Sequence, residues 1–360
     1  MKTPTTGRTS VSSGRATIKD IARVVGVSSS TVARALNDNA RISDGTKLRV
    51  RAAARDLGYV VHSAARLMRG ESSTVVGLTV PDIENDFYAT LARAVAEVCR
   101  DNGFQLVLSI TEDDPEAEFH HLRALVGAQA AGAVVVPTAT PLPGSLSLME
   151  RLPVAQLIRH SPALRSDWFT IDDERGIREA TEHLIALGHD RIGYIGATDD
   201  FSTGTDRLRG YRSALATAGI AERPEMIALG VPRPPFAFAA FERLLERGRP
   251  TAVISGGSQI TVGIIQAISA IGLSVPRDMS FVGYGDSPLY ESWAPRLTTI
   301  GLPVREIALA GSAALIRRIR HLEDPHDAVD SGSHGALFLP RLMIRQSTAT
   351  PEPAIPEIAL

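Results

Sequence analysis

Hydroxyl, guanidinium and amide side chains cluster near the N-terminus, in a pattern that suits recognition of a nucleic acid. Serine hydroxyls bond several kinds of base edge, and an arginine guanidinium bonds both acceptors of a guanine in the major groove. Arg34 is therefore the main candidate for reading sequence, with a phosphate contact or a surface ion pair as alternatives. Ser28 and Thr31 suit helix capping or phosphate anchoring better than base reading. The candidate DNA-contacting residues of this stretch are Thr17, Ser28, Ser29, Ser30, Thr31, Arg34 and Asn37.

The chain lacks the patterns of catalytic or metal chemistry. Adjacent aspartates at 113–114, 172–173 and 199–200 cannot form an acid/base pair, because neighbours on an extended strand point to opposite faces. The histidines at 120, 121, 183 and 189 do not have the helical i, i+4 spacing with a third ligand nearby that a metal site needs. Neither a phosphate-binding GxxxxGK[ST] nor a GxGxxG motif occurs, and the single cysteine, Cys99, suits packing. We expect no catalytic residue, no metal, no cofactor and no enzyme activity.

Three short helices position the polar stretch. Thr17 caps a first helix that Gly26 ends, Ser28 caps a second helix that ends near Asn37, and Ser43 caps a third over residues 44–57. Two short helices joined by a tight, glycine-containing turn form a helix-turn-helix, whose second helix lies in the major groove. The side chains expected in the core are Ile18, Ile21, Ala22, Val25, Val32, Ala35, Leu36, Leu48, either Val50 or the stem of Arg51, Ala54 and Leu57.

The charge of the 360-residue chain is divided unevenly. Residues 1–70 hold 13 Lys and Arg against 4 acidic residues, a net charge of +9, and the rest of the chain carries −11. A basic segment on an acidic body is typical of a nucleic-acid binder with a separate sensing or assembly domain, and a solvated basic helical bundle is the alternative. Residues 1–15 have almost no apolar side chains and are expected to form a disordered basic arm. No membrane span or signal peptide is recognisable, so we expect a cytoplasmic protein with no membrane partner.

The helical segment resembles a known family. Residues 17–60 are similar to the DNA-binding domain of the LacI/GalR family of bacterial transcriptional regulators, through the run TIKDIARVVGVSSSTVARALNDNARISDGTKLRVRAAARDLGYV. The usual serine before Arg34 is Ala33 here, which removes one potential phosphate contact. The resemblance implies a helix-turn-helix domain over residues 16–61 that binds double-stranded operator DNA.

A hinge is expected at residues 62–71, HSAARLMRGE. The segment is too short to be a stable helix alone, since isolated helices below about 12 residues are marginal in water. In the resembling family the hinge orders on DNA and inserts a leucine into the minor groove, a position that corresponds here to Met68, with the small Ala65 beside it. A linker in which Met68 packs on the body is the alternative.

The acidic body alternates apolar strands with helical segments. Runs such as VVGLTV at 75–80 and GAVVV at 132–136 are apolar throughout, which indicates parallel sheets covered on both faces. About ten strands exceed one comfortable sheet, so an α/β body of two doubly wound parallel-sheet subdomains is predicted. A ligand is expected in the cleft between them.

The body resembles the family's effector domain, which has a type I periplasmic-binding-protein fold. Blocks such as ATEHLIALGHDRIGYIG, STGTDRLRGYRSAL and GLSVPRDMSFVGYGD carry the resemblance. It implies an effector-binding and dimerisation domain over residues 72–347, with three crossings between lobes. We expect an N-lobe of about 72–170 and 298–329, a C-lobe of about 171–297 and 330–347, and a tail at 348–360.

The ends of the predicted strands supply candidate effector contacts. Gly257, Ser258 and Gly285 replace amide or acidic residues that accept hydrogen bonds from sugar hydroxyls in many relatives. With fewer carboxylates opposing Arg159 and Arg207, an anionic ligand such as a sugar acid is favoured. Surface ion pairing of Arg207 with Asp206 or Asp199, and packing of Phe87 in the core, are the alternatives. The candidates are Asp82, Phe87, Tyr88, Thr111, Arg159, Asp172, Thr203, Arg207, Ser258 and Asp286.

Together these features predict a regulator, favoured as a repressor, that binds a pseudo-palindromic operator as a homodimer under control of a small metabolite. One helix-turn-helix contacts only a half-site, which is the reason for the homodimer; a tetramer is the alternative assembly. Inducer and corepressor action both remain open. The rival class is a secreted solute-binding protein, against which the basic N-terminal module counts.

Overall fold

The computed structural model describes residues 16–59, 73–323 and 333–351 of the chain. The chain divides into two compact units, and the division falls between Ser73 and Thr74 in the sequence. The predicted arm and hinge, the latter with Ala65 and Met68, lie outside the described residues.

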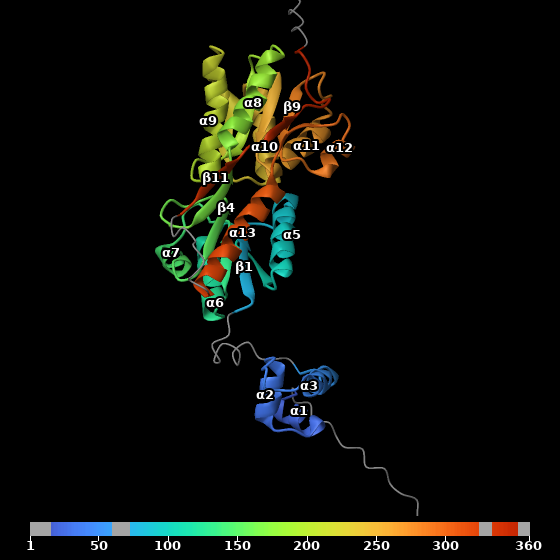
Figure 1. Cartoon of the computed structure of the whole chain (residues 1–360). Helices are drawn as coiled ribbons and strands as arrows, with labels where there is room; N and C mark the ends of the chain where they lie inside the picture. Colours follow the sequence, from blue (N-terminus) through green and yellow to red (C-terminus); the bar gives the residue numbers. More distant parts are fainter. Residues whose placement is uncertain (1–15, 60–72, 324–332, 352–360) are drawn as a thin grey trace, which may run out of the picture. The chain divides into compact units, whose positions relative to one another are not determined.

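The first unit holds three short helices, coloured blue in Figure 1. Thr17 and Asp20 form a reciprocal capping box at the start of the first helix, and Gly26 ends that helix with φ at 73°, a left-handed conformation that glycine adopts without strain. Ser28 Oγ accepts the Thr31 N–H at 3.1 Å and so caps the second helix. The helices therefore begin where the sequence predicts. They are α1 (Ile18–Val25), α2 (Ser29–Leu36) and α3 (Asp44–Asp56).

The core of this unit differs from the prediction on the third helix. Val50, Ala53 and Ala54 of α3 pack against α1 and α2, but Leu48 is 67% exposed and Leu57 37% exposed. Leu48 lies two residues, or about 200°, from Val50 around the helix and therefore faces away from the core. The predicted burial of Leu48 is therefore wrong. Leu57, the C-cap of α3, lies at the edge of the core of this unit.

The second unit begins with a lobe built on a parallel six-stranded sheet of order β11-β5-β4-β3-β1-β2. In Figure 1 the helices α5 and α13 lie side by side on one face of this sheet. No described helix, even the 20-residue α13, is apolar enough over a sufficient length to cross a bilayer. The elements of this N-lobe are β1 (Val75–Val80), α5 (Asp86–Asp101), β2 (Gln105–Ile110), α6 (Pro115–Gly127), β3 (Gly132–Val135), α7 (Pro143–Met149), β4 (Val154–Ile158), β5 (Asp167–Ile171), α13 (Val304–Glu323) and β11 (Gly335–Phe338).

The other lobe has a sheet of order β12-β10-β9-β8-β6-β7, in which only the β10–β12 pair is antiparallel. The two doubly wound lobes match the predicted fold class, with twelve described strands where the sequence suggested about ten. The elements of this C-lobe are α8 (Asp173–Ala186), β6 (Ile192–Ala197), α9 (Ser202–Thr217), η1 (Pro224–Met226), β7 (Ile227–Gly230), α10 (Pro234–Arg247), β8 (Ala252–Gly256), α11 (Ser258–Ile271), β9 (Ser280–Tyr284), α12 (Pro288–Ser292), β10 (Thr298–Gly301) and β12 (Arg341–Met343).

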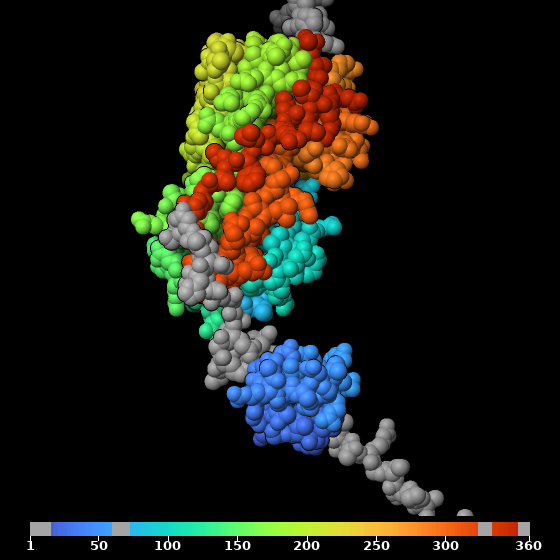
Figure 2. Space-filling view, in the orientation of Figure 1, coloured from blue at the N-terminus to red at the C-terminus, as the bar shows by residue number. Residues whose placement is uncertain are grey.

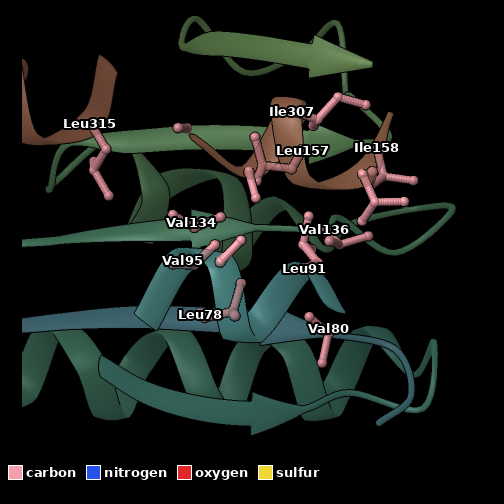
Figure 3. Packing of buried hydrophobic residues seen from close by; sticks show 14 of the residues in the cluster. Leu78, Val80, Leu91, Val95, Val134, Val136, Leu157, Ile158, Ile307 and Leu315 are labelled. Carbon is pink, nitrogen blue, oxygen red and sulfur yellow. The ribbon is translucent and has the colours of Figure 1, made fainter. Parts of the chain in front are cut away.

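The N-lobe core forms where α5 and α13 cover the central strands. Figure 3 shows Leu91 and Val95 of α5 beside Leu78 and Val134 of the sheet. All four side chains are fully buried, which fits strands covered on both faces. This packing holds the carboxyl ends of β1, β3 and β4 in a fixed arrangement at the edge that faces the other lobe.

The chain passes between the lobes three times, after β5, after β10 and after β11. The number of crossings agrees with the resemblance, but two predicted boundaries are wrong. Residues 298–301 form β10 in the C-lobe sheet, because they pair with β9, and residues 335–338 form β11 in the N-lobe sheet, because they pair with β5.

The C-terminal segment is part of the folded C-lobe as far as residue 349 at least. Ser347 Oγ donates to the Phe281 carbonyl at 2.6 Å and accepts the Thr298 N–H at 2.7 Å. His189 Nε2 lies 2.9 Å from the Ala349 carbonyl. In Figure 2 the red chain from residue 333 onward runs over both lobes. The predicted tail boundary at residue 348 is therefore too early.

Candidate functional site

The start of α2 carries a small network of hydroxyl groups. Ser28 Oγ lies 2.9 Å from Ser30 Oγ and 2.8 Å from Thr31 Oγ1, so these three candidate side chains hold one another in place. Ser29 is exposed beside them. Ser28 therefore caps α2 as expected, and the hydroxyl network fixes the polar side chains of the first turn of this helix.

Arg34 is exposed and forms no ion pair or hydrogen bond through its side chain within residues 16–59. Two other cations of this unit are paired: Lys47 and Arg51 both reach Asp38, at 3.1 and 3.0 Å, and hydrogen bonding from Lys47 lowers the pKa of that carboxyl. Arg34 therefore remains available for a partner outside the chain.

The two outer candidates of the unit differ. The Thr17 hydroxyl donates to Asp20 at 2.7 Å within the capping box, and this hydrogen bond is the main cause of the lowered pKa of Asp20. Asn37 is exposed at the C-cap of α2. Thr17 is thus committed to the start of α1, whereas Asn37 lies open at the end of the exposed helix.

A cleft of about 900 Å³ lies at the carboxyl ends of the strands of both lobes. Seven of the ten predicted effector residues line it: Asp82, Phe87, Tyr88, Arg159, Thr203, Arg207 and Ser258. The structure therefore brings together side chains from both lobes, the most distant in sequence being Asp82 and Ser258, which are 176 residues apart.

Arg207 is fully engaged by its own lobe. Its Nε and Nη2 donate to the two oxygens of Asp173 at 3.0 and 3.2 Å, and its Nη1 donates to the Gly256 carbonyl at 3.0 Å. The guanidinium lies 4.1 Å from the centre of the Tyr284 ring, and the Tyr284 hydroxyl also donates to Asp173. Burial alone would lower the pKa of Arg207, but Asp173 and Tyr284 raise it above its ordinary value. Arg207 is permanently charged and paired.

Arg159 is held in a similar way on the opposite lobe. It donates to both oxygens of Asp113, at 2.5 and 3.4 Å, and lies 4.5 Å from the Phe201 ring centre on the C-lobe. Burial would lower the pKa of Arg159, but Tyr88 and Asp113 raise it. Asp113 has φ at 60° and the β-branched Ile158 has φ at 69°, backbone conformations that are costly outside glycine and cluster at binding sites.

These two ion pairs remove the reason for expecting an anionic ligand. The prediction assumed arginines with few opposing carboxylates, but each guanidinium has its own buried or half-buried aspartate. Within the described residues, the charged cleft side chains without an ion pair are mostly acidic: Asp82, Glu84, Glu112 and Asp200 against Arg233. The cleft has no unopposed guanidinium in its interior and does not favour an anion.

Three predicted effector residues do not line the cleft. Thr111 is fully buried and donates to the Val80 carbonyl at 3.4 Å. Asp172 caps α8 by accepting the Arg175 N–H at 3.0 Å. Asp286 is turned toward Arg345, which donates to it at 2.7 and 3.0 Å; burial would raise the pKa of Asp286, but the hydrogen bond from Arg345 lowers it below its usual value.

Sequence reasoning missed Asp113, Phe201 and Tyr284, which complete the site together with Asn85 and Asp173, two residues that follow predicted strands. Asp173 carried a readable signal, because it lies three and four residues before Gly176 and Ile177 on the buried face of α8. Asn85, the N-cap of α5, was also recognisable; its Nδ2 donates to Ser258 Oγ of the other lobe at 3.3 Å. Asp113 depends on a left-handed backbone that no local pattern indicated.

The described residues contain no group of three or more His, Cys, Asp or Glu that could hold a metal ion. Burial raises the pKa of the Cys99 thiol to about 11. The groups that the cleft offers to a ligand are the two arginine–aspartate pairs and the rings of Phe87, Tyr88 and Phe201. These groups can bind and orient a ligand between the two lobes.

A helix-turn-helix joined in one chain to two doubly wound lobes around a cleft defines a class of protein, the ligand-responsive DNA-binding regulators. Residues 17–61 match the family of bacterial regulatory proteins, lacI family, and residues 181–348 match the periplasmic binding protein-like domain. The chain belongs to the LacI family of bacterial transcriptional regulators.

Curated relatives and solved structures agree along most of the chain. The HTH-type transcriptional regulator GalR of Escherichia coli is 32% identical over 93% of this chain and 96% of its own length. The ribose operon repressor of the same species is 32% identical over 84% and 93%. A structure of the lac repressor dimer bound to operator and the anti-inducer ONPF has a TM-score of 0.78 at 24% identity, covering 93% of this chain and all of that one. A transcriptional regulator CelR–cellobiose complex has a TM-score of 0.69 at 27% identity, covering 92% and 100%. These relatives are regulators, not enzymes.

Proposed function

We propose that this regulator is a repressor that binds a pseudo-palindromic operator as a homodimer, and that a neutral polyhydroxylated metabolite in the interlobe cleft changes its affinity for DNA. The observation that carries the proposal is the presence, in one chain, of an exposed and unpaired Arg34 on the second helix of a helix-turn-helix and of a polar cleft between two lobes. A protein of this kind acts in the cytoplasm, where its operator lies.

Each element of the DNA-binding unit has a separate role. Arg34, Ser29 and Ser30 supply base contacts, and Ser28, Thr31 and Asn37 meet phosphates. Thr17 orders the start of α1. The hinge adds Ala65 and Met68 at the operator centre, where an apolar wedge kinks the duplex.

The homodimer is supported by exposed apolar side chains on two sheet edges. Leu108 on β2 is 40% exposed and Leu229 on β7 is 37% exposed, and both strands lie at the edge of their sheets. Val107 and Ile110 on β2 are exposed as well, and a patch of exposed apolar groups marks an interaction site. The similar lac repressor structure is a dimer on its operator. A tetramer is the alternative assembly.

A neutral carbohydrate fits the cleft better than a sugar acid. The carboxylates of Asp113 and Asp173 neutralise Arg159 and Arg207, yet the paired groups still offer hydrogen-bond donors and acceptors to hydroxyl groups. Two similar proteins are consistent with this class, since one is a ribose operon repressor and the other is a regulator in complex with cellobiose. The ligand acts only if it prefers one lobe arrangement, and inducer and corepressor action both satisfy that condition.

The test is selection of a binding site from random duplexes, followed by anisotropy titration of the full chain with and without neutral sugars and sugar acids. We expect a palindromic site, a logarithmic salt slope of about −0.9 per phosphate neutralised, and an affinity change with a neutral sugar only. Salt-independent binding, or no selected duplex, would contradict the DNA assignment. A response to sugar acids alone would contradict the ligand class.

A further inference from the structure

We propose that Glu118, a buried carboxyl on α6, positions Arg159 in the interlobe cleft through the single peptide group between Pro137 and Thr138. Glu118 is fully buried and does not line the cleft, whereas Arg159 does. The inference rests on the proposed function only in treating Arg159 as part of a ligand site. It adds a residue behind that site which controls how the guanidinium is held.

The peptide group between Pro137 and Thr138 is held from both ends. The Thr138 N–H donates to Glu118 Oε2 at 2.8 Å, and the Pro137 carbonyl accepts from Arg159 Nη1 at 3.4 Å. This carbonyl and this N–H belong to one planar trans unit, so they point in opposite directions. A rotation of the unit would break both hydrogen bonds together. The position of the Glu118 carboxyl is therefore transmitted to the guanidinium of Arg159.

A second connection between Glu118 and Arg159 runs through the start of α6. Arg159 donates to both oxygens of Asp113, and Asp113 precedes Asp114, the N-cap of the helix that carries Glu118. Helix α6 and the loop after β3 thus each supply one partner of Arg159, a carboxylate and a carbonyl. The bond from Thr138 to Glu118 joins these two segments, so it helps to set the spacing of the two partners.

The protonation of Glu118 gives this connection a measurable signal. Burial raises the pKa of Glu118, the hydrogen bond from the Thr138 N–H opposes that rise, and the negative charge of Asp113 adds to it. The segments packed against this part of α6, which are β1, β3, α7 and the loop 136–142, contain no titratable side chain. Glu118 therefore takes up its proton at a higher pH than an exposed glutamate does. An uncharged carboxyl accepts a weaker hydrogen bond from Thr138 than a carboxylate does.

The test follows the Cζ resonance of Arg159 by NMR over a pH titration of the full chain with isotope-labelled arginine. Arg159→Lys assigns the resonance. We expect it to shift as Glu118 titrates. Glu118→Gln should remove that step and keep the resonance near its position for the protonated acid, because an amide is also uncharged. Neither sugar nor DNA enters the measurement, so a failure of the proposed ligand class would leave its outcome unchanged.

The matched control is Glu116→Gln, which lies on the same helix at an exposed position and should keep the step. Ser145→Ala is a second variant that leaves Glu118 itself in place. The Ser145 hydroxyl lowers the pKa of Glu118, so its removal should move the step to higher pH. A step that persists in Glu118→Gln, or that Ser145→Ala does not move, would belong to other groups, Asp113 foremost, and would overturn the proposal. The absence of any step in the unchanged protein would overturn it as well.

Discussion

Arg34 and Arg207 carry the same guanidinium in opposite settings. Arg34 is exposed and unpaired within the described part of its unit, whereas Arg207 is bound on three sides by Asp173 and the Gly256 carbonyl. An unpaired, solvated guanidinium can take a partner from another molecule at little cost. A buried, paired one instead fixes the groups around it, because removing its partner would leave an uncompensated charge.

The Arg34→Ala substitution should remove discrimination at one base pair of each half-site. We expect the preference for the correct base to fall by about 1–3 kcal/mol, measured by anisotropy over a set of single-base operator variants. Lys19→Ala, at another exposed position of the unit, is the control and should weaken all sequences alike. A uniform loss with Arg34→Ala would mean that the residue holds a phosphate.

The Asp173→Ala substitution should lower the free energy of unfolding by about 3–5 kcal/mol, since it leaves Arg207 charged, buried and unpaired. The control is Asp206→Ala, whose pair with the half-exposed Arg209 should contribute only about 0–1 kcal/mol. Urea unfolding of both variants compares them. Equal effects would show that the buried pair is no more important to stability than the surface one.

Helix ends are the elements that local sequence determines best. Thr17, Ser28 and Ser43 each cap the helix predicted to follow them, because a cap depends on groups within four residues. The short strands at 298–301 and 335–338 were assigned to the wrong lobes, because their pairing is decided by strands β9 and β5, which are distant in sequence. The alternation of strands and helices predicts two sheets but not which sheet each late strand joins.

The candidate site shows the same limit. Strand ends indicated Tyr88 and Arg159, because carboxyl ends of parallel strands gather at one edge of a sheet. Arg207 was indicated by the resemblance to the family. The direction of each side chain was not available: Asp286 also follows a strand but turns away to Arg345. Nor could the sequence supply Asp113 as a partner for Arg159, since that pairing rests on an uncommon backbone conformation.

Two histidines make the attachment of the C-terminal segment sensitive to pH. His183 bonds Thr348, and His189 bonds the Ala349 carbonyl; burial lowers the pKa of both imidazoles. The folded state therefore takes up protons less readily than the unfolded chain, so stability is retained above a pH of about 6.5 and lost as the pH falls through the lowered pKa values.

We expect Tm to fall between pH 7.5 and 5.5, and a His183→Gln, His189→Gln double variant to reduce that dependence. His120→Gln, at an exposed position on α6, is the control and should keep the full dependence. Differential scanning calorimetry at each pH measures it. An unchanged slope in the double variant would assign the pH response to other groups.

At the scale of the whole molecule, each sheet has two edge strands, and the proposed dimer interface uses only one edge of each sheet. One edge of the N-lobe sheet is β2, with Leu108 exposed, and the other is β11, with Leu337 59% exposed. The proposed dimer uses the β2 and β7 edges, so the exposed side chain on β11 provides an internal comparison.

Leu108→Asp should shift the protein from dimer to monomer in sedimentation velocity, because a carboxylate would have to be desolvated at the interface. Leu337→Asp should leave the dimer intact. The reverse result would place the interface on the β11 edge, and a monomeric unchanged protein would contradict the homodimer.

The three crossings of the chain also bear on its biosynthesis. The N-lobe is the first lobe to leave the ribosome, yet α13 and β11 are made only after nearly all of the C-lobe. Until they arrive, the apolar face that Ile307 and Leu315 cover lacks its second helix, and β5 has an open edge. The N-lobe therefore stays incomplete while the C-lobe is synthesised. A chain that ends before residue 304 would expose this apolar face, and we expect chaperones and proteases to bind it.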